Sequence, residues 1–563
     1  MSKPKRLVDI PMDILLELVL YLDVPDALSL VSSCRQLNVL RAHHSFWHAL
    51  VQNLDVPLAC PPFSDYAKNP RELILRTVQR QRALLSSPNP TPVRVQRYLK
   101  CWDIETICHV PGTNLYLTYG SLEDGMARCW DLTMGTSISQ VYIGRNILSK
   151  STLPVKRGEF LICMLMAETA QEFIATSVVV LCLKYDMDID PNTLSYSPSN
   201  VRLSVLHRSS LDSTYPAMYP SCVINGEGVV AIVKLANSVS ISAFNVFNGA
   251  ECTIETDLTE IDVDYIDLAF NGQDLVILTG NSVTSWLYRC PKDLLPYDTK
   301  TVAASHRSNH LINFVSSSPA IQLDQQLRSY ERWGFYPSGG VNGTKFAATL
   351  YDIVGLGMPP SLECVFWDLE PTATDSGISA ALAHRRTLPG MQFYAVSCMG
   401  SESGTWGAFA CSPRDVGSTG HSIGHDFEID VGIQIAGVPE HITESSDEEV
   451  SWKADIFLIH YDATTRTSNL YRPELPVMMS YISMNDIKSL EFDERLGVLY
   501  ILVESAEGAL PVFVTPMVLV TVEVVEIFSQ RNKVIVPFFI LQNPNRVAKY
   551  LVKFGQSGAV SYC

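Results

Sequence analysis

The side chains best suited to catalysis or metal binding lie in irregular, glycine-rich segments. His421 and His425 stand four residues apart in GHSIGHD, beside Asp426. Imidazole and carboxylate groups are common zinc ligands, but no helix is predicted there to hold the two rings at a fixed spacing, so we expect no metal site. The Ser-Glu-Ser stretch at 401–403 lies between two glycines and is typical of a turn rather than of a nucleophile site.

The sequence lacks the common catalytic and nucleotide-binding motifs. It contains no G-x-S-x-G elbow, no P-loop and no H-E-x-x-H zinc motif. We therefore expect no catalytic residues and no cofactor, and a protein that acts by binding.

One acidic stretch, TESSDEEV at 443–450, could be modified. Ser445 and Ser446 precede three acidic residues, the pattern of a site for an acid-directed kinase, where phosphate would add to the negative charge. The alternative is a solvated loop with no such role, and we favour that interpretation.

Composition predicts a well-folded protein with two domains, one of them large. The chain has 563 residues, of which 47% are apolar and 18% are charged. Residues 1–100 carry 13 Lys and Arg against 8 Asp and Glu, and residues 101–563 carry 29 against 51. An acidic large domain argues against nucleic acid as a partner and favours a basic protein target. Acidity that serves only solubility is the simpler alternative.

Targeting and redox features indicate the cytoplasm or nucleus and no membrane. The start, MSKPKRLVDIP, lacks the apolar core of a signal peptide. The apolar run Leu510–Val522 is too short to span a bilayer and contains two prolines, so it predicts a buried strand. The 14 cysteines are scattered without a C-x-x-C pair, which indicates small buried hydrophobic residues rather than disulfides or a zinc site.

The element that dominates the N-terminal region is a helix predicted from about Pro11 to Leu22. Proline suits a first helical turn, and Asp13 complements the positive end of the helix dipole. Apolar residues go most of the way around this helix, so both of its sides require burial. A unit of fewer than fifty residues hides only about 60% of the surface its unfolded chain exposes. Another molecule is therefore expected to cover part of this helix.

Three more helices are predicted to follow. One starts at Pro25 and runs to Cys34, one passes through Leu37 and Leu40, and one begins at Ser45 with Phe46 and Trp47 just inside. This part of the sequence resembles the F-box family, in the version common among fungal proteins. The residues that carry the resemblance are, in order along the chain, Ile10-Pro11, Asp13-Ile14-Leu15, Leu22, Asp26-Ala27-Leu28, Leu30-Val31, Cys34-Arg35, Leu37, Leu40 and Phe46-Trp47. Ile10 and Asp13 replace the usual Leu and Glu.

The resemblance implies that the helical unit docks on a Skp-type adaptor, which links it to a cullin and a ubiquitin-transferring subunit. Residues expected at the adaptor interface are Ile10, Pro11, Ile14, Leu15, Leu18, Leu22, Leu28, Val31, Cys34, Leu37 and Trp47. A few buried Leu and Ile side chains at about 1.5–3 kcal/mol each can hold a partner. The alternative is an ordinary small bundle packed on the rest of the chain.

A second amphipathic helix is predicted over Asn69–Leu85, opened by a capping box in Asn69, Pro70 and Glu72. Its apolar side holds Leu73, Ile74, Val78 and Leu84, and its basic side holds Arg71, Arg76, Arg80 and Arg82. We expect a semi-rigid spacer with a solvated basic face. The turn-rich SSPNPTP at 86–92 marks the domain boundary.

From residue 93 onward the sequence alternates in the manner of an all-β domain. The segment Asn114–Gly135, with Gly-Ser, Asp-Gly and Trp-Asp in that order, resembles the end of a WD-repeat blade. Weaker echoes occur at Val239–Gly249, Val283–Tyr288, Cys364–Leu369 and Asp455–Tyr461, and Ser489–Leu502 resembles the middle of a blade. Trp130 and Trp367 are expected to pack between blades, whereas the environments of Trp102, Trp333, Trp406 and Trp452 stay open.

The spacing of these strands indicates a propeller with insertions. It varies from about 40 to about 95 residues against the 40–45 of a plain WD-repeat, so we place insertions at 291–344, 371–389 and 412–451. The fold class expected is α+β multidomain: an F-box helical domain at 1–60, a linker helix at 61–92 and a β-propeller-like domain at 93–563 with about seven blades. Two packed β-sandwiches are the alternative architecture.

The function expected from the resemblance is that of a non-catalytic substrate-recognition subunit of an SCF-type ubiquitin ligase. Its partners would be the Skp-type adaptor, a cullin reached through it, and an unknown protein target bound by the propeller. The alternatives are a non-degradative scaffold that uses an F-box-like bundle, and an enzyme that uses the propeller channel.

Overall fold

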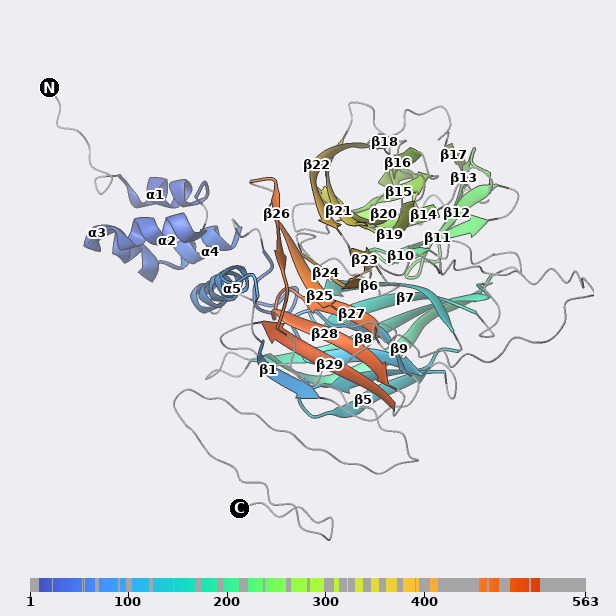
Figure 1. Ribbon diagram of the computed structural model, residues 1–563, viewed down its shortest axis with the longest axis horizontal. Helices are drawn as coiled ribbons and strands as arrows, with labels where there is room; N and C mark the ends of the chain where they lie inside the picture. Colours follow the sequence, from blue (N-terminus) through green and yellow to red (C-terminus); the bar gives the residue numbers. More distant parts are fainter. Residues whose placement is uncertain are drawn as a thin grey trace, which may run out of the picture. The chain divides into compact units, whose positions relative to one another are not determined.

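The computed structural model of the chain places most of the described residues in β-sheets, preceded by helices (Figure 1). All described residues belong to the first of two units, Met1–Phe528. The structure describes residues 10–22, 24–52, 54, 56–65, 70–89, 92–97, 104–120, 125–144, 146–167, 175–189, 196–211, 221–235, 238–259, 265–280, 284–297, 308–312, 321–322, 330–337, 346–353, 361–371, 378–389, 391–393, 406–413, 455–462, 465–474, 487–505 and 508–516.

The helices form where the apolar pattern predicts them, with shorter ends. Pro11 lies just outside the first helix as its N-cap residue, with ψ of 148°, and its carbonyl oxygen accepts from the Leu15 amide at 3.1 Å. The helical elements are α1 Met12–Val19, α2 Val24–Ser32, α3 Arg35–Asn38, η2 Val39–Ala42, α4 His44–Gln52 and α5 Pro70–Leu85, with the short η5 Lys292–Leu294 in the β region.

The helices enclose one apolar core. Val19, Val31, Phe46 and Leu50 are fully buried, one from each of α1 and α2 and two from α4. Ile74 and Val78 of α5 belong to the same cluster. The helix expected to be a semi-rigid spacer is packed against the bundle along part of its length.

The predicted apolar side of α5 is confirmed, because all four of its residues are buried. Its basic side is less uniform than expected. Arg76 forms an exposed pair with Glu72, with 3.1 Å between Arg76 Nε and the carboxylate. Arg80 instead turns toward the β region and donates to a backbone carbonyl there.

The strands of the described residues form seven sheets, six of four strands and one of five. Within each sheet neighbouring strands are antiparallel, except that β13 and β17 are parallel. The first three sheets in chain order contain β2 Ile104–His109, β3 Leu115–Gly120, β4 Met126–Asp131, β5 Thr136–Tyr142; β6 Ile147–Lys156, β7 Glu159–Met166, β8 Ser177–Ile189, β9 Tyr196–Ser210; and β10 Cys222–Ile224, β11 Val229–Leu235, β12 Val239–Asn245, β13 Glu251–Thr256, β17 Ser308–Ile312.

The other four sheets complete the β region. They contain β14 Tyr265–Asn271, β15 Asp274–Gly280, β16 Thr284–Cys290, β18 Ile321–Gln322; β19 Tyr330–Pro337, β20 Phe346–Ile353, β21 Ser361–Pro371, β22 Ile378–Pro389; β23 Met391–Phe393, β24 Trp406–Pro413, β25 Asp455–Asp462, β26 Thr467–Tyr471; and β27 Ile487–Asp493, β28 Val498–Ser505, β29 Gly508–Pro516, β1 Pro92–Arg97.

This strand order is that of a β-propeller. Sheets follow one another along the chain, and the first strands of several successive sheets contact each other: β27 with β2, β6 with β10, β10 with β14 and β14 with β19. The last sheet takes its outermost strand from the opposite end of the region, because β1 pairs antiparallel with β29 (Figure 1). Such closure leaves only short, protected sheet edges.

The predicted all-β character beyond residue 93 is confirmed for the described residues. The expected blade-end strands are the third strands of their sheets. One strand lies outside each of them, namely β5, β13, β18, β22 or β26, and β17 lies beyond β13. The Ser489–Leu502 pattern covers β27 and β28, the first two strands of their sheet.

One predicted insertion is wrong. Residues 371–389 contain β22, which pairs with β21 along its whole length; Pro389 ends β22, and Pro371 ends β21. Proline is tolerated at strand ends and edges, so its presence there did not indicate a loop. The span 291–344 holds η5, β17, β18 and β19, and residues 414–451 lie outside the described residues.

The interior is built from apolar strands and buried thiols. Of the eleven described cysteines, none is in a disulfide, ten are buried and Cys34 is partly buried. Trp406, whose environment the sequence analysis left open, is 2% exposed and packs against His460, Tyr471 and Phe492. No helix in the described part of the chain has the length and hydropathy needed to cross a bilayer.

Candidate protein-docking face and its junction with the β region

Three exposed apolar side chains of the helical bundle form a row on α1 and the turn that follows it. Ile14, Leu18 and Tyr21 are 49%, 39% and 79% exposed. Their spacing of four and three residues places them on one side of a helix, above one another. We call these three residues the α1 row. Because apolar surface of this kind is favourably removed from water, the row is a candidate site for a partner protein.

The rest of α1 is held by the bundle itself. Leu15 and Val19 point into the core, where they join Phe46 and Leu50 of α4. The helix is thus divided into a buried side and an exposed apolar side. The sequence prediction that α1 has more apolar surface than the bundle covers is in accord with this division.

The residues predicted for the adaptor interface fall into three groups by exposure. Pro11, Ile14 and Leu18 are exposed, and Ile10, Leu22, Leu28 and Cys34 are partly buried against the bundle core. Leu15, Val31, Leu37 and Trp47 are 0–5% exposed and lie inside the bundle core. These four side chains are buried in the bundle of the unbound chain, and their part in an adaptor interface stays a prediction.

Trp47 shows why apolar type alone did not separate core from surface. Its indole Nε1 donates to the Arg41 carbonyl oxygen at 2.9 Å. Its ring lies 5.1 Å from that of Phe46, and the Arg71 guanidinium of α5 lies 5.9 Å from the indole ring centre. Burying the polar tip of tryptophan requires such a partner, and here the bundle supplies it. Tyr21, by contrast, was not predicted, although it continues the spacing of Ile14 and Leu18.

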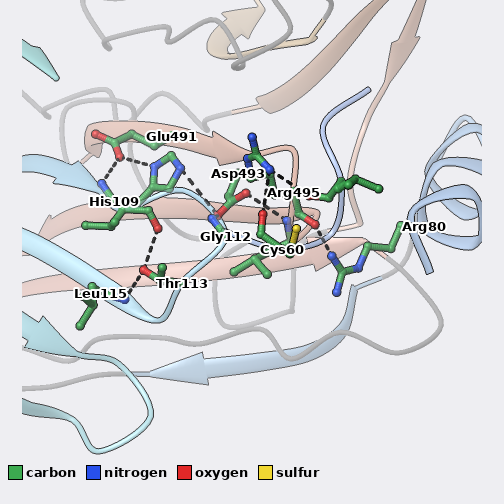
Figure 2. Close-up of polar contacts among 12 residues, drawn as sticks. Cys60, Arg80, His109, Gly112, Thr113, Leu115, Glu491, Asp493 and Arg495 are labelled. Carbon is green, nitrogen blue, oxygen red and sulfur yellow. Dashed lines mark hydrogen bonds and ion pairs between the residues drawn. The ribbon is translucent and has the colours of Figure 1, made fainter. Parts of the chain in front are cut away.

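The connector at residues 56–65 and helix α5 meet the turn between β27 and β28. Arg495, in that turn, donates from Nη1 to the carbonyl oxygens of Leu58 and Cys60 at 3.2 and 2.8 Å. Arg80 of α5 donates to the Arg495 carbonyl oxygen. Figure 2 shows both arginines at this junction. Thr77 of α5 holds the same connector by accepting from the Ala59 amide at 2.9 Å.

The turn between β2 and β3 completes the junction. The Gly112 amide donates to Asp493 Oδ2 at 2.7 Å, while the Leu496 amide donates to Oδ1 of the same carboxylate at 3.0 Å. Gly112 has φ of +71°, and a Cβ atom there would lie 2.8 Å from the Pro61 Cα atom. Only glycine allows this approach of connector and turn without displacement of the backbone.

A buried ionic group adjoins the junction on the first strands of three sheets. Glu491 of β27 accepts from the His109 amide at 2.8 Å and lies 2.9 Å from His109 Nδ1 (Figure 2). Lys150 Nζ of β6 lies 3.9 Å from its other oxygen. His109 Nε2 is also 3.8 Å from Asp493 Oδ2. Glu491 and Asp493 are 2% and 1% exposed, so both need these partners.

The electrostatics follow from this burial. Burial alone would raise the pKa of Glu491, but the hydrogen bonds from His109 and the Lys150 charge outweigh it, so the pKa is lowered. Burial lowers the pKa of Arg80, and the nearby Asp493 carboxylate opposes that effect. Glu491 is thus a carboxylate at neutral pH that ties β27 to β2 and β6.

The junction carries the features of a structural joint. Its charged groups hold backbone atoms from the connector, α5 and two turns of the β region. Within the described ranges, no cluster of three or more His, Cys, Asp or Glu is arranged to hold a metal ion. His421, His425, Asp426, the 401–403 stretch and the 443–450 stretch lie outside the described residues.

Comparison with protein-family models gave no match, and comparison with curated protein sequences gave none. Among solved structures, the chain is similar to the β-propeller domain of Cps50 (Swd1) from Myceliophteria thermophila. The identity is 8% and the TM-score 0.39, over 76% of this chain and 99% of that one. It is also similar to the WD40 repeats of RRP9, at 10% identity and TM-score 0.37 over 76% and 99% of the two chains. The WD40 domain of SCAP from fission yeast matches at 9% identity and TM-score 0.32, over 76% and 94%.

Proposed function

We propose that the chain is a non-catalytic substrate-recognition subunit of an SCF-type ubiquitin ligase. In this proposal the helices at residues 10–54 are an F-box that docks on a Skp-type adaptor, which links the chain to a cullin. The seven sheets are the blades of one propeller that binds the target protein. The α1 row is the single observation that carries the proposal, because it leaves an apolar surface on the element where the F-box resemblance places adaptor contacts.

The energetics of the α1 row suit a protein partner. Completing the burial of Ile14 and Leu18 recovers part of the about 1.5–3 kcal/mol that full burial of each such side chain provides. Tyr21 adds a large aromatic surface with a polar tip, a residue type that is enriched where proteins bind one another. Because the bundle core is already closed beneath the row, binding would require no unfolding of the bundle.

The junction supports a bridging role. A subunit that presents a target to a second enzyme works best when target site and docking site keep a fixed geometry, because positioned reactants react faster. Asp493, Arg495 and Arg80 hold the connector and α5 against the β region through buried polar contacts.

The test is co-purification of the full-length chain with a Skp-type adaptor. Replacing Ile14 and Leu18 with Asp places two charges in the row, and we expect adaptor binding to be lost. Phe63→Asp is the matched control, because Phe63 is 58% exposed in the connector and its φ of +58° suits Asp at least as well as Phe. The control should bind the adaptor like the unaltered chain.

Two results would contradict the proposal. Adaptor binding at unaltered strength in the Ile14→Asp, Leu18→Asp variant would exclude the row as the docking site. Adaptor binding without recovery of a cullin would favour a non-degradative scaffold instead. Circular dichroism of each variant checks that the bundle and the β region stay folded.

A further inference from the structure

Two buried thiols from successive sheets meet between β7 and β10. The Cys222 Sγ atom lies 3.8 Å from the Cys163 carbonyl oxygen and 3.7 Å from Ser149 Oγ of β6. The two thiols are also hydrogen-bonded to each other. Cys163 and Cys222 are 0% and 3% exposed. We call these two residues the β7/β10 thiol pair.

The register of the strands explains why the two thiols meet. The Cys222 amide donates to Ser149 Oγ of β6 at 3.3 Å. Two residues further along both strands, the Ile224 amide donates to Ser151 Oγ at 3.4 Å. Cys163 lies directly opposite Ser151 in the antiparallel ladder of β6 and β7. Residues paired in this way share one side of their sheet, so Cys163 faces β10 as Ser151 does.

The contact makes the two sulfur atoms chemically different. The hydrogen bond from the Cys163 thiol lowers the pKa of Cys222, while burial opposes that effect. The Ser149 hydroxyl and the Leu165 backbone lower the same pKa further. The shared hydrogen bond and burial both raise the pKa of Cys163. Because the thiolate is the nucleophile in thiol chemistry, an oxidant should react first with Cys222.

Strand β10 offers a route by which a small oxidant reaches the pair. Buried cysteines are usually inert because nothing reaches them. β10, however, has only three residues, Cys222–Ile224, and three paired positions with β11. β7 is paired with β8 at all eight of its positions. Segments with few contacts open locally at the lowest free energy, so β10 can expose Cys222 while Cys163 stays in its ladder.

We propose that the β7/β10 thiol pair is an oxidation site at which hydrogen peroxide forms a disulfide between two successive sheets. The Cys222 thiolate attacks one peroxide oxygen, the O–O bond breaks, and a sulfenic acid and a hydroxide ion result. The Cys163 sulfur then attacks the Cys222 sulfur and the S–O bond breaks. The hydroxyl group leaves with the Cys163 proton as water. Both thiols are thereby oxidised, and the peroxide is reduced.

The disulfide would hold β10 against β7 and prevent the local opening that admits the oxidant. It would close a chain segment of about sixty residues, and cross-links of that length restrict the opened and unfolded chain strongly. A reductant would restore the free thiols. The pair lies on strands that the α1 row does not use, so this proposal does not depend on whether the helices dock on an adaptor.

The test treats the folded full-length chain with hydrogen peroxide after reduction and removal of the reductant. We expect the intact mass to fall by that of two hydrogen atoms. Digestion with trypsin and a glutamate-specific protease should give a cross-linked peptide that contains Cys163 and Cys222. Cleavage after Glu168 and Glu172 separates Cys163 from Cys182, so the assignment is unambiguous. Hydrogen exchange in β10 should slow by about tenfold or more after oxidation and recover after reduction.

Three variants separate the roles of the thiols. In Cys163→Ser, oxidation of Cys222 should stop at the sulfenic acid, which dimedone labels. In Cys222→Ser, Cys163 should stay unlabelled. Cys182→Ser is the matched control, because Cys182 is 2% exposed in the same apolar cluster but its thiol interacts with the Glu159 carboxylate. This control should form the Cys163–Cys222 cross-link to the same extent as the unaltered chain.

Several results would overturn the proposal. One is oxidation of the folded chain without a Cys163–Cys222 cross-link, whether other cysteines pair or none does. Another is a cross-link that appears only when the chain is denatured before treatment. Loss of the cross-link in Cys182→Ser would show that the pair does not act alone. Equal dimedone labelling of Cys163 in Cys222→Ser and of Cys222 in Cys163→Ser would refute Cys222 as the attacking sulfur.

Discussion

Replacing Gly112 with Ala tests the junction, with Gly249→Ala as the matched control. The two glycines have nearly the same backbone conformation, with φ of +71° and +74°. They differ in what surrounds them. A Cβ atom at Gly249 would meet nothing within 4 Å, whereas one at Gly112 would lie 2.8 Å from the Cα and N atoms of Pro61.

The magnitudes follow from these surroundings. The left-handed conformation costs Ala about 1–2 kcal/mol at either position. At Gly112 the backbone of Pro61 must also move, which strains the 2.7 Å hydrogen bond from the Gly112 amide to Asp493. A hydrogen bond to a charged group contributes about 1.5–3 kcal/mol. We therefore expect a loss of about 1–2 kcal/mol for Gly249→Ala and about 3–5 kcal/mol for Gly112→Ala.

Native-state hydrogen exchange is the appropriate measurement, because a chain with a helical unit and a large β region need not unfold in one step. In Gly112→Ala, amides of the connector, of the β2–β3 turn and of the β27–β28 turn should exchange faster, and those of β12 should not. In Gly249→Ala, any acceleration should be confined to the β12–β13 turn. Equal opening free energies for the connector in both variants would refute the assignment of the junction as a structural joint.

Three further predictions follow from buried groups. Burial lowers the pKa of His460 to about 4 from 6.5, so protonation favours the unfolded state. The contribution of His460 to the free energy of unfolding is fully present above pH 6.5 and decreases toward pH 4, with a loss of about 2 kcal/mol at pH 5. Denaturant unfolding at several pH values measures this loss, which should be smaller in His460→Phe. Leu50→Ala should destabilise the bundle by about 2–5 kcal/mol, seen as faster exchange in α1 and α4. Glu491→Gln removes the charge facing His109 and Lys150 and should lower the thermal midpoint, whereas Glu251→Gln, at an exposed site, should not.

The sequence predicted the elements that depend on local pattern. Apolar spacing and proline at first turns located α1, α2 and α5 to within a few residues. Strand alternation and Trp-Asp-like endings located β4, β12, β16, β21 and β25. The sheet of β6–β9 was not recognised as a blade, because β7 and β8 are almost continuously apolar and lack that ending. A fully buried strand loses the alternation by which a strand is recognised.

The candidate site was only partly predictable, for two physical reasons. Leu15 and Leu18 are the same residue type on one helix, and only the position of α4 decides that the first is buried and the second exposed. The junction joins residues that are about four hundred positions apart, such as Arg495 and Cys60. No local pattern encodes such a pair, and its polar character was compatible with an ordinary solvated turn.

The pairing of β1 with β29 has a consequence for folding during translation. Strand β1 leaves the exit tunnel early, but its hydrogen-bonding partner is complete only when Pro516 has been added. Until then the last sheet cannot form completely, and the nascent chain carries β1 as an unpaired strand next to the helices in sequence. A truncated messenger RNA that ends before the codons for β29 would therefore encode a chain in which β1 stays unpaired. We expect such a chain to aggregate, to be bound by chaperones or to be degraded, even if its helices can still bind a partner.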